Sequence, residues 1–327
     1  MDPILNDLVD LLRTRRLTSG WPPGELASTL GLSRARVSHA LDDLRSLGYC
    51  FTVDAREHVH LTAAPDRMID TEILSGLKTR VFGRHLHCYK RVGSTNTRAA
   101  ELADSGAPEG TLVVAEEQVE GRGRLGRGWH SAQGLGIWSS VILRPQLPLP
   151  RAYGLSLLAA LAFAEIAASE LGLEVDLKWP NDGLIAGRKI LGVLSELSTE
   201  KDRLRYAICG MGINVSHQLE DFPPELRRTA GSLAMAAGHP VERVAFFRVF
   251  LAAFERLYRG FRREGIAPYL DDYRRRSLLL GREVSVVLGR ETIRGKAVAI
   301  DENGALIVRV GRQDRVVFAG EASLQQN

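Results

Sequence analysis

The chain has 327 residues and a mass of 36.0 kDa, a length typical of two or three domains of about 100–200 residues each. Hydrophobic residues make up 45% and charged residues 25% of the chain, which excludes a mainly disordered protein, a collagen-like repeat and a disulfide-rich scaffold. Three widely separated cysteines (Cys50, Cys88 and Cys209) include no CxxC pair. We therefore expect a reducing compartment and no zinc knuckle.

Net charge is divided unevenly. Residues 1–65 hold seven Arg/Lys and eight Asp/Glu, whereas the rest of the chain holds 36 and 31. The pI of about 9.1 therefore does not reflect a basic N-terminal arm, and any contact with nucleic acid must come from locally placed arginines.

Met1-Asp2-Pro3 does not resemble a signal peptide. The apolar run Leu155–Ala168 is interrupted by Ser156 and Glu165, and we expect it to be too short to cross a bilayer. The prediction is a cytoplasmic protein with no membrane partner.

Residues 1–65 have the pattern of a winged helix-turn-helix. Apolar residues from Ile4 to Leu12 follow a helical period, and a second helix is predicted over Gly24–Leu30. Gly31 suits a turn with positive φ, and Ser33 is a good N-cap for a third helix that runs to Leu47. Two short strands, predicted at Tyr49–Val53 and Val59–Leu61, complete a hairpin.

The start of the third helix is a candidate DNA-binding surface, because a recognition helix presents these positions to bases and phosphates. The predicted contact residues are Ser33, Arg34, Arg36, Ser38 and His39. A helical protein-interaction module with a solvated polar face is the alternative. Binding to a fixed DNA sequence usually requires a dimer, so the rest of the chain should supply one.

A polar stretch beginning at Thr62 predicts a linker, which we place at residues 66–79, before a central domain at residues 80–276. Strands and long helices alternate there without a regular βαβ order, which favours an α+β fold with a mixed sheet. Strands are predicted at Leu86–Val92, Thr111–Glu116, Gly136–Leu143, Asp176–Trp179, Ile190–Leu197 and Arg205–Ile213, and helices at Arg151–Leu171 and Val241–Gly265. Residues 277–327 alternate strictly, with an Asn303-Gly304 turn, and predict a small SH3-like β-barrel.

The segment Gly121-Arg-Gly-Arg-Leu-Gly-Arg-Gly-Trp129 is the most unusual in the chain. It contains a GxGxxG pattern, but a predicted strand follows it instead of a helix, and no acidic residue occurs between Glu120 and Glu165. A Walker A loop is excluded because Arg127-Gly128 follows Gly126 where Lys-Ser/Thr is needed. A dinucleotide-binding oxidoreductase is therefore disfavoured.

The arginines of this segment point to an anionic ligand. Arg122, Arg124 and Arg127 can each bind phosphate bidentately, and the glycines allow the backbone to approach an anion closely. Since three like charges on a short loop repel one another, we expect the loop to be disordered until the ligand arrives. A solvated basic loop without a ligand is the alternative.

A second cluster is Lys178-Trp-Pro-Asn-Asp182, followed by Arg188 and Lys189. We expect Lys178 and Asp182 to form a charge pair. A lysine beside arginines would neutralise the negative charge that develops when a carboxylate attacks a nucleotide α-phosphate. Asp182 would then help an incoming amine to lose its proton. A purely structural ion pair is the alternative.

These two clusters, with Gly192–Leu197 and Gly210-Met-Gly-Ile-Asn214, occur in the order and spacing of the biotin–protein ligases. With the helix-turn-helix in front, the chain resembles the bifunctional biotin ligases and biotin operon repressors of bacteria. The resemblance implies biotin-binding and adenylate-binding residues, with Lys189, Asp182 and Arg124 as catalytic groups. The implied biotin-binding residues are Ser94, Thr95, Asn96, Gln118, Arg122, Gly123, Arg124, Lys189 and Gly192. The implied ATP- and adenylate-binding residues are Arg124, Arg127, Trp129, Asn181, Lys189 and Asn214.

The same resemblance implies a reaction in two steps. Biotin and Mg-ATP form biotinyl-5′-AMP and pyrophosphate, and biotin is then transferred to a lysine of a biotin carboxyl carrier domain of acetyl-CoA carboxylase. No dedicated metal site is expected, because Mg²⁺ arrives with ATP, near Asn181. The adenylate would promote a homodimer that represses biotin synthesis genes. The alternatives are a monofunctional ligase with a vestigial DNA-binding domain and a catalytically inactive ligand-sensing transcription factor.

Two departures from the family pattern bear on these expectations. Leu125 and Gly128 stand where repressor-ligases carry further basic residues, so this loop has less charge. The wing, Ala55-Arg-Glu-His-Val-His-Leu61, lacks the usual glycines, which bears on how its backbone would contact DNA.

Overall fold

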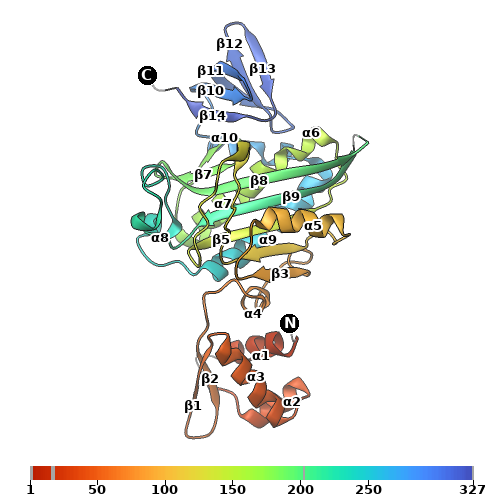
Figure 1. Cartoon of the computed structure of the whole chain (residues 1–327), viewed down its shortest axis with the longest axis vertical. Coiled ribbons are helices and arrows are strands. Elements are labelled where there is room, and N and C mark those ends of the chain that lie inside the picture. Colours follow the sequence, from red (N-terminus) through yellow and green to blue (C-terminus); the bar gives the residue numbers. More distant parts are fainter. Residues whose placement is uncertain (1–2, 16–18, 202, 326–327) are drawn as a thin grey trace. The chain divides into compact units, whose positions relative to one another are not determined.

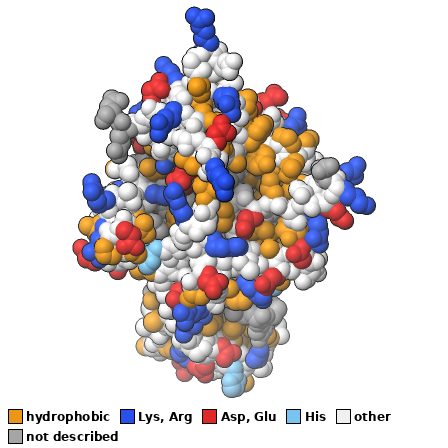
Figure 2. All heavy atoms as spheres, turned by 45° about the horizontal axis from the view of Figure 1, so that its top comes forward, with side chains coloured by type: hydrophobic (Ala, Val, Ile, Leu, Met, Phe, Trp, Pro, Cys, Tyr) orange, Lys and Arg blue, Asp and Glu red, His pale blue; other side chains and the backbone are white. Residues whose placement is uncertain are grey.

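The structure is a computed structural model that describes residues 3–15, 19–201 and 203–325. It separates into two compact units, Met1–Lys78 and Thr79–Asn327 (Figure 1). On the face drawn in Figure 2, basic and acidic side chains are interspersed. The net positive charge therefore does not gather into a single basic patch on that face.

The first unit begins with three helices and a two-stranded hairpin. They are α1 (Pro3–Thr14), α2 (Pro23–Leu30), α3 (Arg34–Ser46), β1 (Cys50–Val53) and β2 (Val59–Ala63). Gly31 takes a φ of 64° at the turn between α2 and α3, and the Ser33 hydroxyl accepts a hydrogen bond from the Arg36 backbone N–H at 3.2 Å. Both local predictions are confirmed. At the tip of the hairpin Glu57 has a φ of 64°, so a glutamate occupies a left-handed position that glycine favours.

A short helix that the sequence did not predict, α4 (Asp70–Leu74), belongs to the same unit. Its Glu72 is buried, and the carboxylate accepts hydrogen bonds from Arg13 at 2.7 and 2.8 Å and from the Tyr49 hydroxyl at 2.5 Å. This network holds α4 against α1 and the hairpin. The segment that we expected to be a linker is thus partly folded onto the helices before it.

The second unit is built on a mixed sheet in the order β3-β4-β5-β9-β8-β7-β6. Only β3 and β4 pair in parallel; the other neighbours within this sheet, among the described residues, are antiparallel. The strands are β3 (Leu86–Tyr89), β4 (Leu112–Ala115), β5 (Gly136–Leu143), β6 (Asp176–Lys178), β7 (Asp182–Ile185), β8 (Arg188–Glu200) and β9 (Arg203–Asn214). The α+β class with a mixed sheet is as predicted, but β7 was missed.

Helices cover both faces of this sheet (Figure 1). On one face α5 (Thr95–Asp104) packs through Ala99 and Ala103 against β4, β5 and β9. On the other face lie α7 (Gly154–Leu171) and α9 (Arg243–Glu264), which pack on each other. The shorter helices are α6 (Leu149–Ala152), α8 (Leu233–Ala237) and α10 (Leu270–Arg275). The sequence predicted the long helices, but not α5, α8 or α10.

The apolar stretch around α7 needs a correction. Leu149–Leu171 spans 23 residues and is long and apolar enough to cross a membrane by composition alone, so the expectation that the run is too short was wrong. However, 78% of its apolar window is buried inside the protein. Such burial is what the core helix of a folded domain requires, because its apolar surface packs on the sheet and on α9.

The C-terminal region forms a second sheet in the order β13-β12-β11-β10-β14, with all neighbours antiparallel. Its strands are β10 (Glu283–Leu288), β11 (Glu291–Ile300), β12 (Leu306–Val310), β13 (Gln313–Val317) and β14 (Glu321–Leu324). No ladder joins β13 to β14 within the described residues, so a closed barrel is not found. The sheet is fastened to the first one by Trp179, whose indole N–H donates to the Gly304 carbonyl at 2.9 Å.

One buried carboxylate fixes the start of the second unit. Glu255 on α9 is 4% exposed and accepts hydrogen bonds from the backbone N–H groups of Arg80, Val81 and Phe82, each at 2.7 Å. It therefore anchors the segment that leads into β3.

We predict that Glu255→Ala lowers the free energy of unfolding by about 2–3 kcal/mol, because backbone donors lose a charged acceptor at a buried site. Glu255→Gln, which keeps one oxygen acceptor, should lose less. Urea denaturation of the full chain, followed by circular dichroism, measures both. Equal midpoints for the alanine variant and the parent would contradict this role.

Candidate active site

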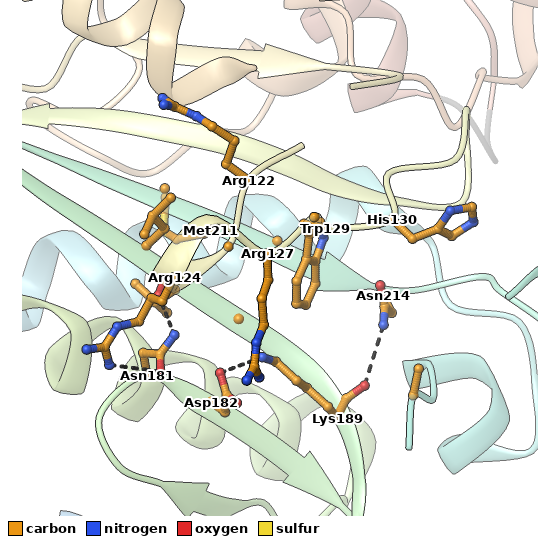
Figure 3. A pocket seen from close by; sticks show the side chains of 18 of the residues that line it. Arg122, Arg124, Arg127, Trp129, His130, Asn181, Asp182, Lys189, Met211 and Asn214 are labelled. Atoms are coloured by element: carbon orange, nitrogen blue, oxygen red, sulfur yellow. Dashed lines mark hydrogen bonds and ion pairs between the residues drawn. The ribbon is translucent and has the colours of Figure 1, made fainter. Parts of the chain in front are cut away.

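A cavity of about 550 Å³ opens in the second unit between the mixed sheet, the glycine–arginine loop and the C-terminal sheet (Figure 3). Its lining comes from segments far apart in the sequence. Every residue that the resemblance proposed for catalysis or for binding biotin or ATP lines it: Ser94, Thr95, Asn96, Gln118, Arg122, Gly123, Arg124, Arg127, Trp129, Asn181, Asp182, Lys189, Gly192 and Asn214. The structure thus brings the whole predicted set together.

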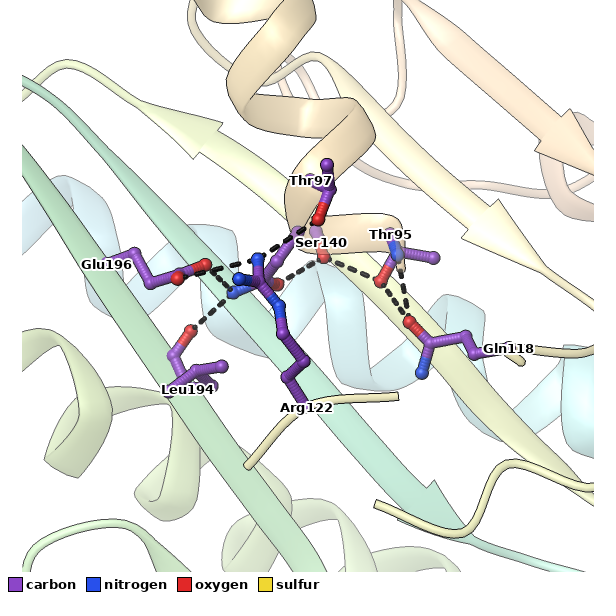
Figure 4. A network of polar contacts seen from close by, with 8 residues as sticks. Thr95, Thr97, Gln118, Arg122, Ser140, Leu194 and Glu196 are labelled. Atoms are coloured by element: carbon purple, nitrogen blue, oxygen red, sulfur yellow. Dashed lines mark hydrogen bonds and ion pairs between the residues drawn. The ribbon is translucent and has the colours of Figure 1, made fainter. Parts of the chain in front are cut away.

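One end of the cavity is polar and uncharged. Thr95 and Asn96 lie at the start of α5, where the helix approaches β5 and β9, and both are buried. The side-chain oxygen of Gln118 accepts from the Thr95 backbone N–H at 2.8 Å and lies 3.0 Å from the Thr95 hydroxyl oxygen (Figure 4). The Ser140 hydroxyl lies 2.6 Å from Asn96 Oδ1. These contacts hold hydrogen-bonding groups in fixed positions, as a small polar ring would require.

The glycine–arginine loop is closed by its own backbone. The Gly123 N–H donates to the Arg127 carbonyl at 2.7 Å, and the Trp129 N–H donates to the Gly121 carbonyl at 2.8 Å. Between them Leu125 has a φ of 54°. The structure shows a closed turn at this loop, and the expectation that the loop is disordered until a ligand binds stays a prediction.

The three guanidinium groups of the loop diverge to different oxygen partners. Arg122 donates to the Thr97 hydroxyl at 3.0 Å, Arg124 to Asn181 Oδ1 at 3.5 Å, and Arg127 to the Glu321 carboxylate at 2.5 Å. Separate partners reduce the mutual repulsion that the sequence suggested.

Trp129 lies against bare backbone. Gly192 on β8 and Gly212 on β9 are opposite each other in the sheet. A Cβ atom would come within 2.6 Å of the indole at Gly192 and within 2.5 Å at Gly212. Glycine at both positions is therefore needed for the ring to lie on the sheet, and the ring closes one wall of the cavity.

The charge pair is different from the one predicted. Asp182 contacts the Lys189 ammonium at 2.7 Å rather than pairing with Lys178 (Figure 3). Asp182 lies on β7, the strand that the sequence analysis missed, opposite Lys178 on β6. β7 forms a hairpin with β8, which begins beside Lys189. The Lys189 ammonium also lies 5.2 Å from the centre of the Trp129 ring, so it is held between a carboxylate and an aromatic face.

The middle of the cavity is cationic. Its lining includes five Lys and Arg side chains (Arg122, Arg124, Arg127, Lys178 and Lys189) but only two carboxylates in the described chain, Asp182 and Glu321. Burial lowers the pKa of the Arg124 guanidinium, while Asp182 and Glu321 act in the opposite direction. A half-buried cation whose nearest partner is a neutral amide is suited to an anionic ligand.

Two asparagines line the cavity with their amide nitrogens engaged. The Asn181 amide donates to the Val193 carbonyl at 2.7 Å, and the Asn214 amide donates to the Gly231 carbonyl at 3.0 Å. Within the described residues no group of three His, Cys, Asp or Glu side chains could hold a metal ion.

Some lining residues were not among the predicted site residues. Glu321 comes from β14 of the C-terminal sheet, and Phe222 and Leu226 come from the loop after β9. An isolated glutamate near the end of the chain carries no local motif, so only the packing of the second sheet brings it to the cavity.

The predicted DNA-contacting residues lie elsewhere, in the first unit. Ser33 caps α3, and Arg34, Arg36, Ser38 and His39 follow on its first turns, all exposed. All five lie at the start of the third helix.

Comparison with known proteins agrees with this geometry. Residues 88–214 match the model of the "Biotin/lipoate A/B protein ligase family", and residues 279–325 match the "Biotin protein ligase C terminal domain". The bifunctional ligase/repressor BirA of Bacillus subtilis is 39% identical over 92% of this chain and 92% of its own length. This chain belongs to the biotin protein ligase family.

Other family members match parts of the chain to different extents. BirA of Escherichia coli is 28% identical over 97% of this chain and 96% of its own length. The biotin–[acetyl-CoA-carboxylase] ligase of Mycobacterium tuberculosis is 34% identical over 73% of this chain and 88% of its own. The biotin protein ligase of Aquifex aeolicus, solved in complex with biotin and ATP, superposes with a TM-score of 0.64 at 32% identity. It covers 75% of this chain and all of the solved one.

In this member of the family, the lining residue Phe222 packs on a buried histidine, His217. The ring of His217 is fully buried and stacks on Phe222, a lining residue, at 4.7 Å between centres. Neither ring nitrogen has a hydrogen-bond partner in the described structure. Burial lowers the pKa of His217 from its ordinary 6.5 to about 4, and the charges of His130 and Arg243 act in the same direction.

We predict that His217→Phe makes the protein less sensitive to acid. The unfolded histidine takes up a proton near pH 6.5 and the folded one only near pH 4, so its stabilising contribution is complete above 6.5 and is lost as the pH falls. The parent should lose about 2 kcal/mol of unfolding free energy relative to the variant between pH 7.5 and pH 5. Urea denaturation at both pH values measures it, and a parallel decline in parent and variant would contradict it.

Proposed function

We propose that this protein activates biotin with ATP to biotinyl-5′-AMP and transfers the biotin to a lysine of a biotin carboxyl carrier protein. The observation that carries the proposal is that one cavity joins an uncharged polar end to a cluster of cations. The polar end suits the ring of biotin, and the cations suit its carboxylate and the phosphates of ATP. The membership of the chain in the biotin protein ligase family supports the same assignment.

The first step joins a carboxylate to a phosphate. One oxygen of the biotin carboxylate attacks the α-phosphorus of ATP, and the bond to pyrophosphate breaks. Lys189 and Arg124, which both line the cavity, would neutralise the negative charge that builds up on the α-phosphate. Asp182, 2.7 Å from the Lys189 ammonium, holds that ammonium in position.

The second step forms an amide. The amine of the acceptor lysine attacks the carbonyl carbon of the adenylate, and AMP leaves with the bonding electrons. The attacking amine must lose a proton, and Asp182 is the nearest carboxylate to Lys189 that could accept it. The closed loop over the cavity keeps water away from the mixed anhydride meanwhile.

The remaining proposed ligand groups divide between the two substrates. For biotin they are Ser94, Thr95, Asn96, Gln118, Arg122, Gly123 and Gly192, and for the nucleotide Arg127, Trp129, Asn181 and Asn214. Mg²⁺ would enter bound to the ATP phosphates. The side-chain oxygens of Asn181 and Asp182 in the cavity lining are the hard oxygen donors that Mg²⁺ prefers, and one or two such ligands suffice when phosphates supply others. When bound, the ion neutralises phosphate charge.

We predict that Lys189→Met lowers the rate of biotin transfer by roughly 100-fold or more, because a preorganised charge at the reacting phosphate is lost. The assay supplies biotin, Mg-ATP and a biotin carboxyl carrier domain and detects the biotinylated product by mass spectrometry. Lys90→Met, at an exposed lysine outside the cavity, is the matched control. No product with the parent would contradict the proposed function, and full activity of Lys189→Met would contradict the role of Lys189.

A second function is favoured by the first unit. We propose that residues 1–65 form a winged helix-turn-helix that binds operator DNA and represses biotin synthesis genes. The exposed cap and first turns of α3 support this, as does similarity over nearly the whole chain to ligase/repressors. We further propose a cytoplasmic homodimer that forms when the adenylate is bound and so spans two half-sites. We also propose domain limits at residues 66–79, 80–276 and 277–327, with an SH3-like fold for the C-terminal sheet.

We predict that Arg34→Ala weakens operator binding by about tenfold or more, as expected for an arginine that contacts bases or phosphates. Fluorescence anisotropy with a duplex from upstream of the biotin synthesis genes, with biotin and ATP present, measures it. Arg45→Ala, near the far end of α3 and paired with Asp42, is the control and should bind nearly as the parent does.

The same titration separates the alternative functions. Operator binding that does not depend on biotin and ATP would contradict the coupling between the ligand and DNA. Biotin transfer without any operator binding would identify a monofunctional ligase, and operator binding without transfer would identify a ligand-sensing transcription factor.

A further inference from the structure

A glutamate outside the cavity contacts two residues that line its polar end, Asn96 and Arg122. Glu196 lies on β8 and is half-buried, and in the described structure it is not among the residues that line the cavity. One of its carboxylate oxygens accepts a hydrogen bond from the Asn96 amide nitrogen at 2.7 Å. The other lies 3.6 Å from the Arg122 guanidinium (Figure 4). It thus touches the floor of the cavity and the loop above it.

The contact with Asn96 decides which way that amide faces. The Asn96 nitrogen donates to the Glu196 carboxylate and, at 3.2 Å, to the Leu194 carbonyl, both of which can only accept. The amide oxygen must therefore point the other way, toward Ser140 at 2.6 Å. Asn96 is 4% exposed, so it cannot turn without leaving a buried polar group unpaired.

The orientation of the Asn96 amide determines the direction of the hydrogen bonds between the neighbouring hydroxyls. Because the Asn96 oxygen can only accept, the Ser140 hydroxyl donates its single hydrogen to it. The Ser140 oxygen can then only accept in its 2.8 Å contact with Thr95. That contact takes the single hydroxyl hydrogen of Thr95, so the Thr95 oxygen, which lines the cavity, is left with lone pairs. This part of the floor therefore favours ligand groups that donate hydrogen bonds, such as the N–H groups of a cyclic urea.

The contact with Arg122 anchors the loop. Arg122 also donates to the Thr97 hydroxyl at 3.0 Å, so its guanidinium is held between α5 and β8. An exposed ion pair contributes little to the free energy of folding by itself. Here it connects a loop residue to the same carboxylate that orients the floor.

We propose that Glu196 is a positioning residue for biotin: through Asn96 it keeps the floor oriented to accept the N–H groups of the biotin ring, and through Arg122 it holds the loop against that floor. The inference rests on the proposed function, because it takes biotin as the ligand of the polar end. It places no step of the reaction on Glu196, which acts only through its two neighbours.

Isothermal titration calorimetry of the full chain with biotin and, separately, with ATP tests the inference. Glu196→Ala should raise the Kd for biotin about tenfold, as expected for loss of a charge-assisted hydrogen bond. The Kd for ATP should stay within about twofold, because the cationic part of the cavity is untouched. Glu196→Gln should lie between the alanine variant and the parent, since its oxygen can still accept from Asn96 while its charge no longer faces Arg122. Glu200→Ala, at an exposed glutamate on the same strand, should match the parent.

A second titration shows whether the effect passes through Asn96. In an Asn96→Ala background, Glu196→Ala should weaken biotin binding by no more than about threefold, because most of the coupling is already lost. A full additional tenfold loss there would overturn the positioning role, as would an unchanged Kd in Glu196→Ala alone or an equal loss for biotin and ATP. A parent that binds no biotin would instead overturn the proposed function.

Discussion

The indole of Trp129 lies on two glycines that face each other across neighbouring strands, and the closed form of the cavity depends on that contact. Gly192 and Gly212 are cross-strand partners, and a side chain at either one would overlap the ring. The tryptophan ends the glycine–arginine loop, whose backbone folds back so that the Trp129 N–H reaches the Gly121 carbonyl. A flat, bare patch of sheet thus fixes the position of a loop that carries three arginines.

The chemistry follows from what that loop covers. Below it, β8 brings Lys189 and β7 brings Asp182 into contact, while the start of α5 supplies an uncharged polar floor. From the side, β14 of the C-terminal sheet contributes Glu321, the partner of Arg127. The contact between Trp179 and Gly304 fastens that sheet to the turn before β7. One cavity therefore has separate places for a neutral ring and for phosphates, which is what joining a carboxylate to a nucleotide requires.

Much of this arrangement could be predicted from the sequence because the motifs are dense and local. The Gly121–Trp129 loop and Lys178-Trp-Pro-Asn-Asp182 indicated the cavity residues directly. The charge partner of Asp182 could not be predicted, since β7 has only four residues, Asp182-Gly-Leu-Ile185, too few to indicate a strand from their types. The link from Asn96 to Glu196 joins residues 100 positions apart, and it depends on how α5 packs on the sheet. The prediction of a closed C-terminal barrel was wrong, because β14 pairs with β10 and not with β13.

The measurement that tests this account most directly is ATP–pyrophosphate exchange that depends on biotin, with Gly212→Ala beside the parent and lipoate and octanoate as controls. The account predicts exchange with biotin alone, and a rate at least about tenfold lower in Gly212→Ala, because the added methyl group displaces Trp129 and overpacking is costly. The melting temperature should show that the variant is folded. Unchanged exchange in that variant, or no exchange with biotin in the parent, would contradict it.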